Sequence, residues 1–418
     1  MDGKGKSNQA RSKGLSSTLN EDRLSQLPDP LIIQILDHLY TKQAAKTSVL
    51  SKRWRHLWLW VSSFDLTSLR FTDFKAFVSV GDRIFDSTRA SRIHKLRLRL
   101  FNETEDRLYS VKDVSFLTSW LDAAAKRKIQ HLDLHLCECD KSHFYMKPLN
   151  FYHCETLVCL KLSDVALDDA SAHFVSFPCL KKMRLLENVY PSEATFEKLV
   201  SSCPVLEEFE VHILGEDAKV FRVRSQSLKR LTLIRDHSYS SNSLVPGVVV
   251  DAPLLSCLSI NDLASESFLV DNLVPRAKLG ITITFGSGYI DEIVKRSRIR
   301  SFLLGVSKVG DMTLCAYTFQ LLCDYSEFEP LPRFGYMSRL GVDLRVSYFK
   351  WLPTFLETCR NMKSLILTWD SHDGEMSPKR RIINEASEVL VREFSNPQET
   401  YSPFGGAFNK RNDTQRPS

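Results

Sequence analysis

The sequence predicts an α+β protein in which a small three-helix unit precedes a curved solenoid of short repeats, with strands on the concave face and helices or loops on the convex face. Three observations predict this fold. Apolar residues recur at helical spacing between residues 21 and 64. A short leucine pattern then returns many times from residue 93 onward. Finally, a chain of 418 residues with 43% hydrophobic and 25% charged side chains can bury a core of this extent.

The charge distribution argues against nucleic acid as the main partner. The net charge is +6, but residues 1–60 hold 10 Lys and Arg against 5 Asp and Glu, and residues 376–418 hold 7 against 5. The 315 residues between them hold 39 against 40, a neutral balance that is poorly suited to a phosphate backbone. Residues 1–20 are polar, and we expect them to form a disordered basic tail.

The sequence carries no signal for membrane insertion or secretion. It has no run of about 18 apolar residues, and its first residues lack the apolar stretch of a secretory signal. The 10 cysteines form no C-x-x-C pair, so we interpret them as small buried apolar residues in a reducing compartment. We therefore expect no membrane association and a location in the nucleus, the cytoplasm or both.

The N-terminal unit is predicted to contain three helical stretches. The first has Asp29 as its expected N-cap and Pro30 at its first helical position. Its apolar residues crowd one side, and they are Leu31, Ile32, Ile35, Leu36 and Leu39. A second stretch follows Thr41, and the third contains Leu50, Trp54, Leu57 and Trp58. About forty residues cannot bury this much apolar surface alone, so part of it must contact the rest of the chain or a partner.

From residue 93 onward the pattern L-x-x-L-x-L recurs, with Ile, Val, Met or Phe sometimes replacing Leu. The clearest copies are IHKLRLRL from 93, IQHLDLHL from 129, LVCLKLSDV from 157, LKKMRLLENV from 180, LEEFEVHI from 206, LKRLTLI from 228 and LSCLSINDL from 255. Weaker copies start at residues 277, 299, 337 and 362. This pattern, at a period mostly in the twenties, is typical of leucine-rich repeats.

Each repeat is expected to contribute one strand to a continuous sheet. The alternating leucines should point into the solenoid, and the residues between them should point outward on its concave face. Helix-like stretches such as SFLTSWLDAAAKR from 115 and EATFEKLVSSCP from 193 fill the gaps between strands. The alternative is an ordinary α/β domain of βα units, which the recurring motif disfavours.

The N-terminal helical unit resembles the F-box, the adaptor-binding motif of cullin–RING ubiquitin ligases. The resemblance is carried by Leu27-Pro28, by the apolar run of the first helix, and above all by the string S-V-L-S-K-R-W-R-x-L-W from Ser48 to Trp58, which is close to the plant form. Gln43 stands where the family commonly has an acidic residue. An F-box followed by irregular leucine-rich repeats resembles a large plant family of substrate receptors.

The resemblance implies recruitment without catalysis, as the substrate-recognition subunit of an SCF-type (cullin–RING) E3 ubiquitin ligase. The F-box would dock on a Skp-type adaptor, and through it on a cullin, while the repeats would hold an unknown target protein near the ubiquitin-conjugating enzyme. The residues expected to bind the adaptor are Leu27, Pro28, Ile32, Ile35, Leu36, Leu50 and Trp54. Trp58 is expected to pack inside the unit instead.

The resemblance also sets the expected domain organisation. The expected segments are a disordered basic tail over 1–20, an F-box over 21–64, leucine-rich repeats over 90–370 that weaken after 277, and a divergent, largely disordered tail over 371–418. Residues 337–370 resemble the approach to the FBD segment with which many plant relatives end. The expected Pro-Cys-Leu continuation is absent, and MSPKRRIINEASEVLVREFSNPQET instead predicts one short helical stretch.

One cluster of residues raises the possibility of a metal site. His131, His135, Cys137, Cys139, His143, His153 and Cys154 fall within 24 residues. On a strand, however, His131 and His135 would lie about 13 Å apart, too far to share one ion. The sequence also contains no phosphate-binding loop, G-x-S-x-G elbow or H-E-x-x-H helix. We therefore predict no metal, no cofactor and no catalytic residue.

The residues between the strand leucines are predicted to form a candidate target surface on the concave face. The proposed target-binding residues are Arg97, Arg99, Asp133, Lys161, Arg184, Glu208 and Glu210. This pattern is basic in the early strands, with an acidic stripe near the middle, and a target of complementary charge would fit it. An equally good interpretation is that a solvated strand face carries charges in any case.

A second functional class stays open at this stage. The chain could be a non-catalytic interaction scaffold, or a truncated competitor, whose F-box does not act in a ligase. The sequence identifies neither the target nor the pathway, and it does not tell whether recognition needs a modification or a small ligand.

Overall fold

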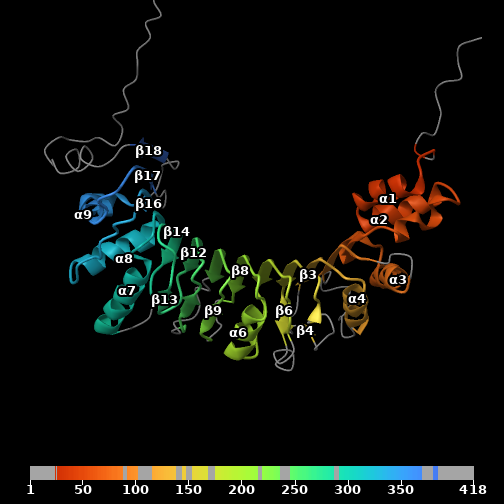
Figure 1. The fold of residues 1–418 in the computed structure, drawn as a ribbon, viewed down its shortest axis with the longest axis horizontal. Coiled ribbons are helices and arrows are strands. Elements are labelled where there is room, and N and C mark those ends of the chain that lie inside the picture. The colour runs from red at the N-terminus through yellow and green to blue at the C-terminus, as the bar shows by residue number, and fades with distance from the viewer. Residues whose placement is uncertain are drawn as a thin grey trace, which may run out of the picture.

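The computed structural model describes residues 24, 26–87, 92–101, 115–137, 144–146, 153–167, 175–214, 219–235, 245–286, 291–369 and 380–384. Within them, helices and strands are mixed. A small helical unit at the N-terminal end leads into a long row of strands (Figure 1). The elements of the helical unit are α1 (Asp29–Asp37), α2 (Thr41–Lys46) and the 3₁₀ turns η1 (Thr47–Val49) and η2 (Trp54–Leu59).

Among the described residues, this row is one sheet of thirteen strands. In sheet order they are β1 (Ser63–Thr67), β2 (Lys95–Phe101), β3 (His131–Cys137), β5 (Cys159–Ser163), β7 (Lys182–Leu186), β8 (Glu208–Ile213), β10 (Arg230–Arg235), β12 (Cys257–Asp262), β14 (Lys278–Ile283), β15 (Asp311–Leu314), β16 (Arg339–Leu344), β17 (Ser364–Trp369) and β18 (Arg380–Asn384). The first twelve run parallel, and β18 pairs antiparallel with β17. Strands therefore stack in chain order, as expected for repeats that bury one another.

Shorter strands and helices complete the repeats. Strands β9 (Phe221–Arg224), β11 (Val248–Asp251) and β13 (Phe268–Asp271) form a second parallel sheet, and β4 (Phe144–Met146) pairs with β6 (Val165–Leu167). The further helices are η3 (Ser68–Arg70), α3 (Phe74–Phe85), α4 (Ser115–Lys126), α6 (Glu193–Ser201), α7 (Glu292–Val306), α8 (Ala316–Ser326), η5 (Val346–Trp351) and α9 (Leu352–Glu357). Figure 1 shows α4, α6 and α7 on the same side of the main row as these shorter strands.

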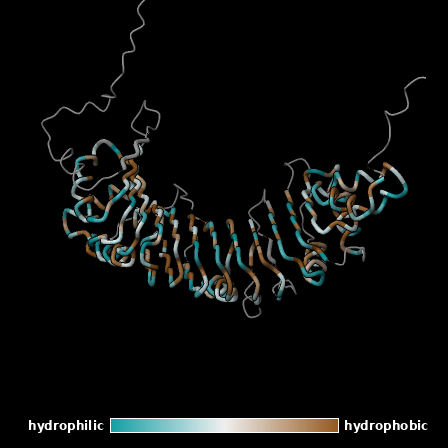
Figure 2. The backbone as a smooth tube through the Cα atoms, turned by 45° about the horizontal axis from the view of Figure 1, so that its top comes forward, coloured by the Kyte–Doolittle hydropathy of each residue, from teal (hydrophilic) through white to brown (hydrophobic). Residues whose placement is uncertain are grey.

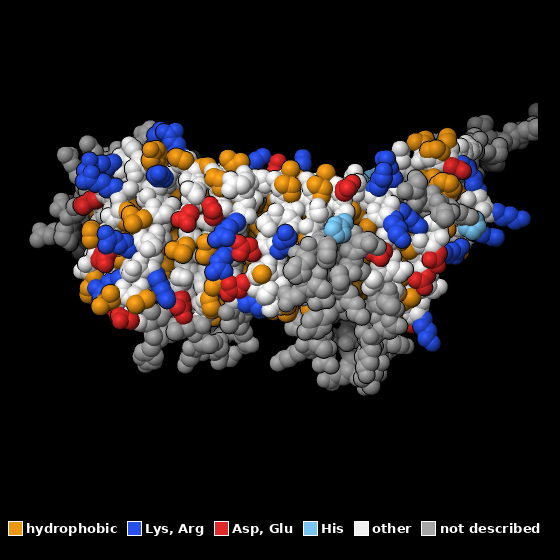
Figure 3. Space-filling model, turned by 60° about the horizontal axis from the view of Figure 1, so that its bottom comes forward, with side chains coloured by type: hydrophobic (Ala, Val, Ile, Leu, Met, Phe, Trp, Pro, Cys, Tyr) orange, Lys and Arg blue, Asp and Glu red, His pale blue; other side chains and the backbone are white. Residues whose placement is uncertain are grey.

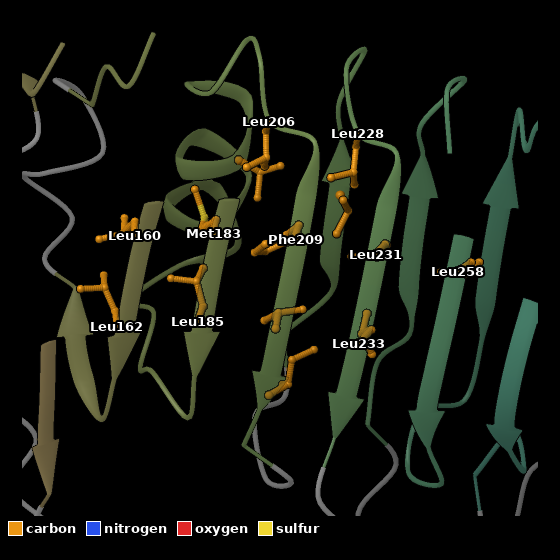
Figure 4. Close-up of a cluster of buried hydrophobic side chains, with 14 of the residues drawn as sticks. Leu160, Leu162, Met183, Leu185, Leu206, Phe209, Leu228, Leu231, Leu233 and Leu258 are labelled. Carbon is orange, nitrogen blue, oxygen red and sulfur yellow. The ribbon is translucent and has the colours of Figure 1, made fainter. Parts of the chain in front are cut away.

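The core lies between the main sheet and this layer of helices and short strands. Along β2, Leu96, Leu98 and Leu100 are buried while the residues between them are exposed or half-buried. Figure 4 shows the equivalent side chains of β5, β7, β8 and β10 pointing into one shared layer, and Figure 2 shows hydrophobic segments recurring from strand to strand. The predicted alternation of leucines in and polar residues out is confirmed for these strands.

The sheet begins before the first segment that the repeat pattern identified. Strand β1 carries only Phe64 and Leu66 as buried alternating residues, yet it pairs in register with β2. At the other end, residues 380–384 form a strand, where the sequence predicted a short helical stretch. The predicted disordered tail over 1–20 lies outside the described residues, and so does the predicted tail over 371–418 apart from residues 380–384.

Two side chains of the helical unit attach it to the first strand. Asp37, the last residue of α1, accepts hydrogen bonds from the backbone N–H groups of Ser62 and Ser63, at 3.0 and 2.9 Å. Thr41, buried at the start of α2, accepts one from the N–H of Asp65 at 2.7 Å. Because these bonds satisfy the backbone of β1, the helical unit and the sheet are parts of one folded body.

The packing of α4 against α3 depends on a glycine. A Cβ at Gly81 would lie 2.0 Å from the ring of Trp120, whose indole N–H donates to Asp82 at 2.9 Å. We expect Gly81→Ala to lower the free energy of unfolding by about 1–3 kcal/mol, although alanine favours helix formation, because the Trp120 ring must move. Urea unfolding measures the loss. Gly335→Ala is the control, since a Cβ there meets nothing within 4 Å, and an equal loss in both variants would contradict this account.

Candidate functional site

The helical unit exposes large apolar side chains that its own core does not cover. Ile35 on α1 is 41% exposed, and Val49 and Leu50, next to each other after α2, are 84% and 65% exposed. The other members of this set are Leu24, Leu31 and Leu39. We call these six residues the apolar helical face. Figure 3 shows hydrophobic side chains gathered at this end of the molecule (upper right). Exposed apolar side chains of this kind make the face a candidate interaction site.

Three of the seven predicted adaptor-binding residues lie in the core instead. Ile32, Leu36 and Trp54 are 0%, 1% and 4% exposed, so they hold the helical unit together and cannot contact a partner in this conformation. Trp58 is also buried, as predicted. On α1, Ile32 and Leu36 face inward while Ile35 faces outward. Part of the apolar run that was predicted to bind the adaptor therefore belongs to the core.

The remaining four predicted residues, Leu27, Pro28, Ile35 and Leu50, have surface to offer a partner. Pro28 is exposed, and Leu27 is half-buried against the core. Pro28 rather than Asp29 is the N-cap of α1, and no side chain caps it, so the predicted cap is wrong by one residue. As a result, the Asp29 carboxylate is left to bind elsewhere.

The Arg53 guanidinium binds the Asp29 carboxylate and links two parts of the helical unit. It contacts Asp29 Oδ1 at 2.6 Å and donates to the carbonyl oxygen of Leu27 at 2.5 Å. Arg53 belongs to the L-S-K-R-W string that also contains Leu50, so it links the exposed turn after α2 to the residues at the start of α1. Sequence reasoning could not find this contact, because Arg53 and Asp29 lie 24 residues apart.

The predicted target-binding residues of the early strands lie side by side but neutralise one another. Register places Asp65, Arg97, Asp133 and Lys161 in one row across β1, β2, β3 and β5. Arg97 contacts Asp65 at 3.1 Å and Asp133 at 3.0 Å, while Lys161 approaches Asp133 at 4.0 Å and Arg99 approaches it at 3.9 Å. Desolvation lowers the pKa of Arg97, but the hydrogen bonds to Asp133 and Asp65 outweigh it and raise the pKa overall.

The middle strands repeat this arrangement with other partners. Arg184 contacts Glu210 at 3.0 Å, and Glu208 is held between Lys182, at 2.9 Å, and Arg230. Hydrogen bonds from Lys182 and Arg230, working against desolvation, lower the pKa of the Glu208 carboxyl. The acidic stripe predicted near the middle therefore consists of paired charges. The seven predicted target-binding residues therefore form cross-strand ion pairs, and they present little net charge to a target.

The candidate metal residues do not converge in the described part of the chain. Within it, no three His, Cys, Asp or Glu side chains are placed to hold an ion. The ring of His131 packs against that of His94 with centroids 4.9 Å apart, and burial followed by the nearby His94 lowers the pKa of His131. Cys139 and His143 lie outside the described residues. No helix in the described part is both long and apolar enough to cross a membrane.

A helical unit with the F-box string, hydrogen-bonded to a stack of leucine-rich repeats, defines an F-box/leucine-rich-repeat protein. The F-box domain family model matches residues 24–66, and the model for the leucine-rich repeats of FBD-associated F-box protein At5g56370 matches residues 117–271.

Similar proteins of Arabidopsis thaliana match over most of their length. Putative F-box/FBD/LRR-repeat protein At2g05300 is 49% identical over 368 residues, which cover 88% of this chain and 81% of that protein. Putative FBD-associated F-box protein At5g53635 is 50% identical over 363 residues, covering 86% and 83%. F-box/FBD/LRR-repeat protein At5g22660 is 40% identical over 358 residues, covering 83% and 76%. The chain belongs to the plant F-box/FBD/LRR-repeat family.

Proposed function

We propose that this protein is the substrate-recognition subunit of an SCF-type ubiquitin ligase, with its F-box bound to a Skp-type adaptor and its repeats bound to a target protein. F-box proteins generally act in this way. The observation that supports it most is the apolar helical face, because Ile35, Val49 and Leu50 are exposed on a unit that is otherwise well packed. Burying such side chains against a partner contributes roughly 25 cal/mol per Å² of apolar surface.

The attachment of the F-box to β1 supports the same proposal. Asp37 and Thr41 bind the backbone of the first strand, so a target held by the sheet would keep a fixed position relative to the adaptor. We propose that the strand row curves as a solenoid and holds the target on its concave face. The gain is one of effective concentration, since a tethered target meets the ubiquitin-conjugating enzyme far more often than a free one. In this mechanism the chain itself makes and breaks no covalent bond.

A reconstituted ligase tests this proposal. The full chain, a Skp-type adaptor, a cullin–RING module and plant extract proteins would be incubated with tagged ubiquitin, and ubiquitinated proteins would be compared by mass spectrometry with and without the chain. We expect a small set of proteins to be modified only when the chain is present. An unchanged set, despite a chain that binds the adaptor, would favour a scaffold or competitor whose F-box works outside a ligase.

The Arg53 contact leads to a prediction about adaptor binding. Arg53→Ala should weaken adaptor affinity about three- to tenfold, because Leu27 and Pro28 lose their tie to the turn that carries Leu50. Its effect on the free energy of unfolding should stay within about 1 kcal/mol, since the ion pair with Asp29 is largely exposed. Titration calorimetry and thermal unfolding would separate the two effects. Arg55→Ala, an exposed neighbour, is the control and should change neither.

A further inference from the structure

A second charged surface lies at the C-terminal end of the sheet, where the sequence drew no attention. The first residues of β14, β15 and β16 are Lys278, Asp311 and Arg339, and register makes them direct neighbours. Other cations lie where the chain enters these strands or the next one. The cations of this surface, which we call the C-terminal basic edge, are Arg276, Lys278, Lys308, Arg339 and Lys363.

Backbone hydrogen bonds fix the neighbours of this edge. The N–H of Arg276 donates to the carbonyl of Lys308 at 2.8 Å, and the N–H of Lys363 donates to Ser338, next to Arg339, at 2.8 Å. Adjacent strands lie about 4.8 Å apart, so Lys278 and Arg339, two strands apart, are separated by roughly 10 Å. An extended peptide covers that distance in about three residues.

The charges of the C-terminal basic edge are not neutralised within the described part of the chain. None of its five cations has a carboxylate oxygen within 4.0 Å there, including that of Asp311. The contrast with the earlier strands is direct, because Lys182 and Arg230 occupy the same row and share Glu208. Within the described residues, the edge therefore carries net positive charge, whereas the charges of the earlier strands are neutralised in ion pairs.

The next outward row leaves space beside these cations. It runs through the small residues Ser259, Gly280 and Thr313, and it ends against Gly341, which is buried. A Cβ at Gly280 would find only the Ser259 hydroxyl, at 3.7 Å, so packing does not require glycine there. Glycine inside a strand weakens it and often marks a place where another backbone approaches closely.

From the unpaired cations and the open row beside them, we propose that the C-terminal basic edge binds an acidic, extended segment of the target protein. The segment lies across Gly280 and Thr313 and directs carboxylates about three residues apart to Lys278 and Arg339. This inference rests on the proposed function, and it names the chemistry of the target. Nucleic acid fits less well, because the row offers no aromatic side chain for base stacking.

Fluorescence anisotropy of the full chain, alone and with a Skp-type adaptor, tests this inference. The probe is a fluorescein-labelled peptide with Asp at every third position and Ser between, and the comparison probes are the Lys analogue and a poly-uridine strand. We expect Lys278→Gln/Arg339→Gln/Lys363→Gln to weaken binding of the Asp peptide at least fivefold. Added salt should weaken the wild type in the same direction. The control Lys75→Gln/Lys126→Gln/Lys198→Gln removes as many exposed charges elsewhere and should stay within twofold.

A second variant tests the open row without changing charge. Gly280→Leu should weaken binding of the Asp peptide while leaving thermal unfolding unchanged or improved, since it fills space that the fold does not use. Equal binding of the Asp and Lys peptides, equal effects of both triple variants, or tighter binding of poly-uridine would each overturn the inference. Adaptor binding is measured on the same samples, so a folded chain that binds the Asp peptide but no adaptor would contradict the proposed function and leave this edge standing.

Discussion

Asp262→Ala is expected to lower the free energy of unfolding by about 3–5 kcal/mol, because it removes a buried carboxylate that pairs with a buried guanidinium. Asp262 at the end of β12 and Arg235 at the end of β10 are both 0% exposed at their side chains, with Arg235 Nε 3.2 Å from Asp262 Oδ2. The same carboxylate accepts hydrogen bonds from the backbone N–H of Ala264 and Ser265 and from the Ser265 hydroxyl. One side chain therefore supports both the ion pair and the turn after β12.

Urea unfolding followed by circular dichroism measures this effect. The matched control is Glu197→Ala, which breaks the more exposed ion pair with Arg224 and should cost no more than about 1 kcal/mol. If Asp262→Ala does not fold, Asp262→Asn keeps the shape and the hydrogen-bond acceptor while removing the charge, and it should fall between the wild type and the alanine variant. Similar midpoints for Asp262→Ala and Glu197→Ala would show that the buried pair is not needed.

The second large effect concerns the apolar helical face. Ile35→Asp/Leu50→Asp should weaken binding to a Skp-type adaptor at least about a hundredfold, because two central interface side chains at roughly 2 kcal/mol each would be lost and two charges buried. Both side chains are exposed, so thermal unfolding of the free chain should change little. The control Leu269→Asp/Leu304→Asp places the same charges on exposed positions of the repeats and should bind the adaptor normally. A double variant that binds as tightly as the wild type would move the interface elsewhere.

Most of the repeat strands could be predicted because their signal is local, but the weak copy from residue 299 lies in helix α7 and not in a strand. In L-x-x-L-x-L the alternation decides which side chains are buried, and Leu96, Leu132 and Leu160 follow it in neighbouring strands. Strand β1 was missed because Phe64 and Leu66 alone do not make a repeat pattern. Its place in the sheet comes from pairing with β2 and from the hydrogen bond that Thr41 accepts.

The site could be predicted only in part, because its properties depend on contacts between distant segments. The apolar run of α1 predicted an apolar surface for a partner, but helical spacing alone could not tell that Ile32 faces the core and Ile35 faces outward. The charges of the early strands were visible in the sequence, whereas their pairing was not. Arg97 and Asp133 lie 36 residues apart and meet only through strand register.

The most direct test of the central claim, that the F-box of this chain docks on a Skp-type adaptor, is titration calorimetry of a purified adaptor into the full wild-type chain. We predict a one-to-one complex with a dissociation constant of about 1 μM or tighter, and a negative change in heat capacity from the burial of the apolar helical face. A folded chain that gives no heat of binding at several temperatures would contradict the claim.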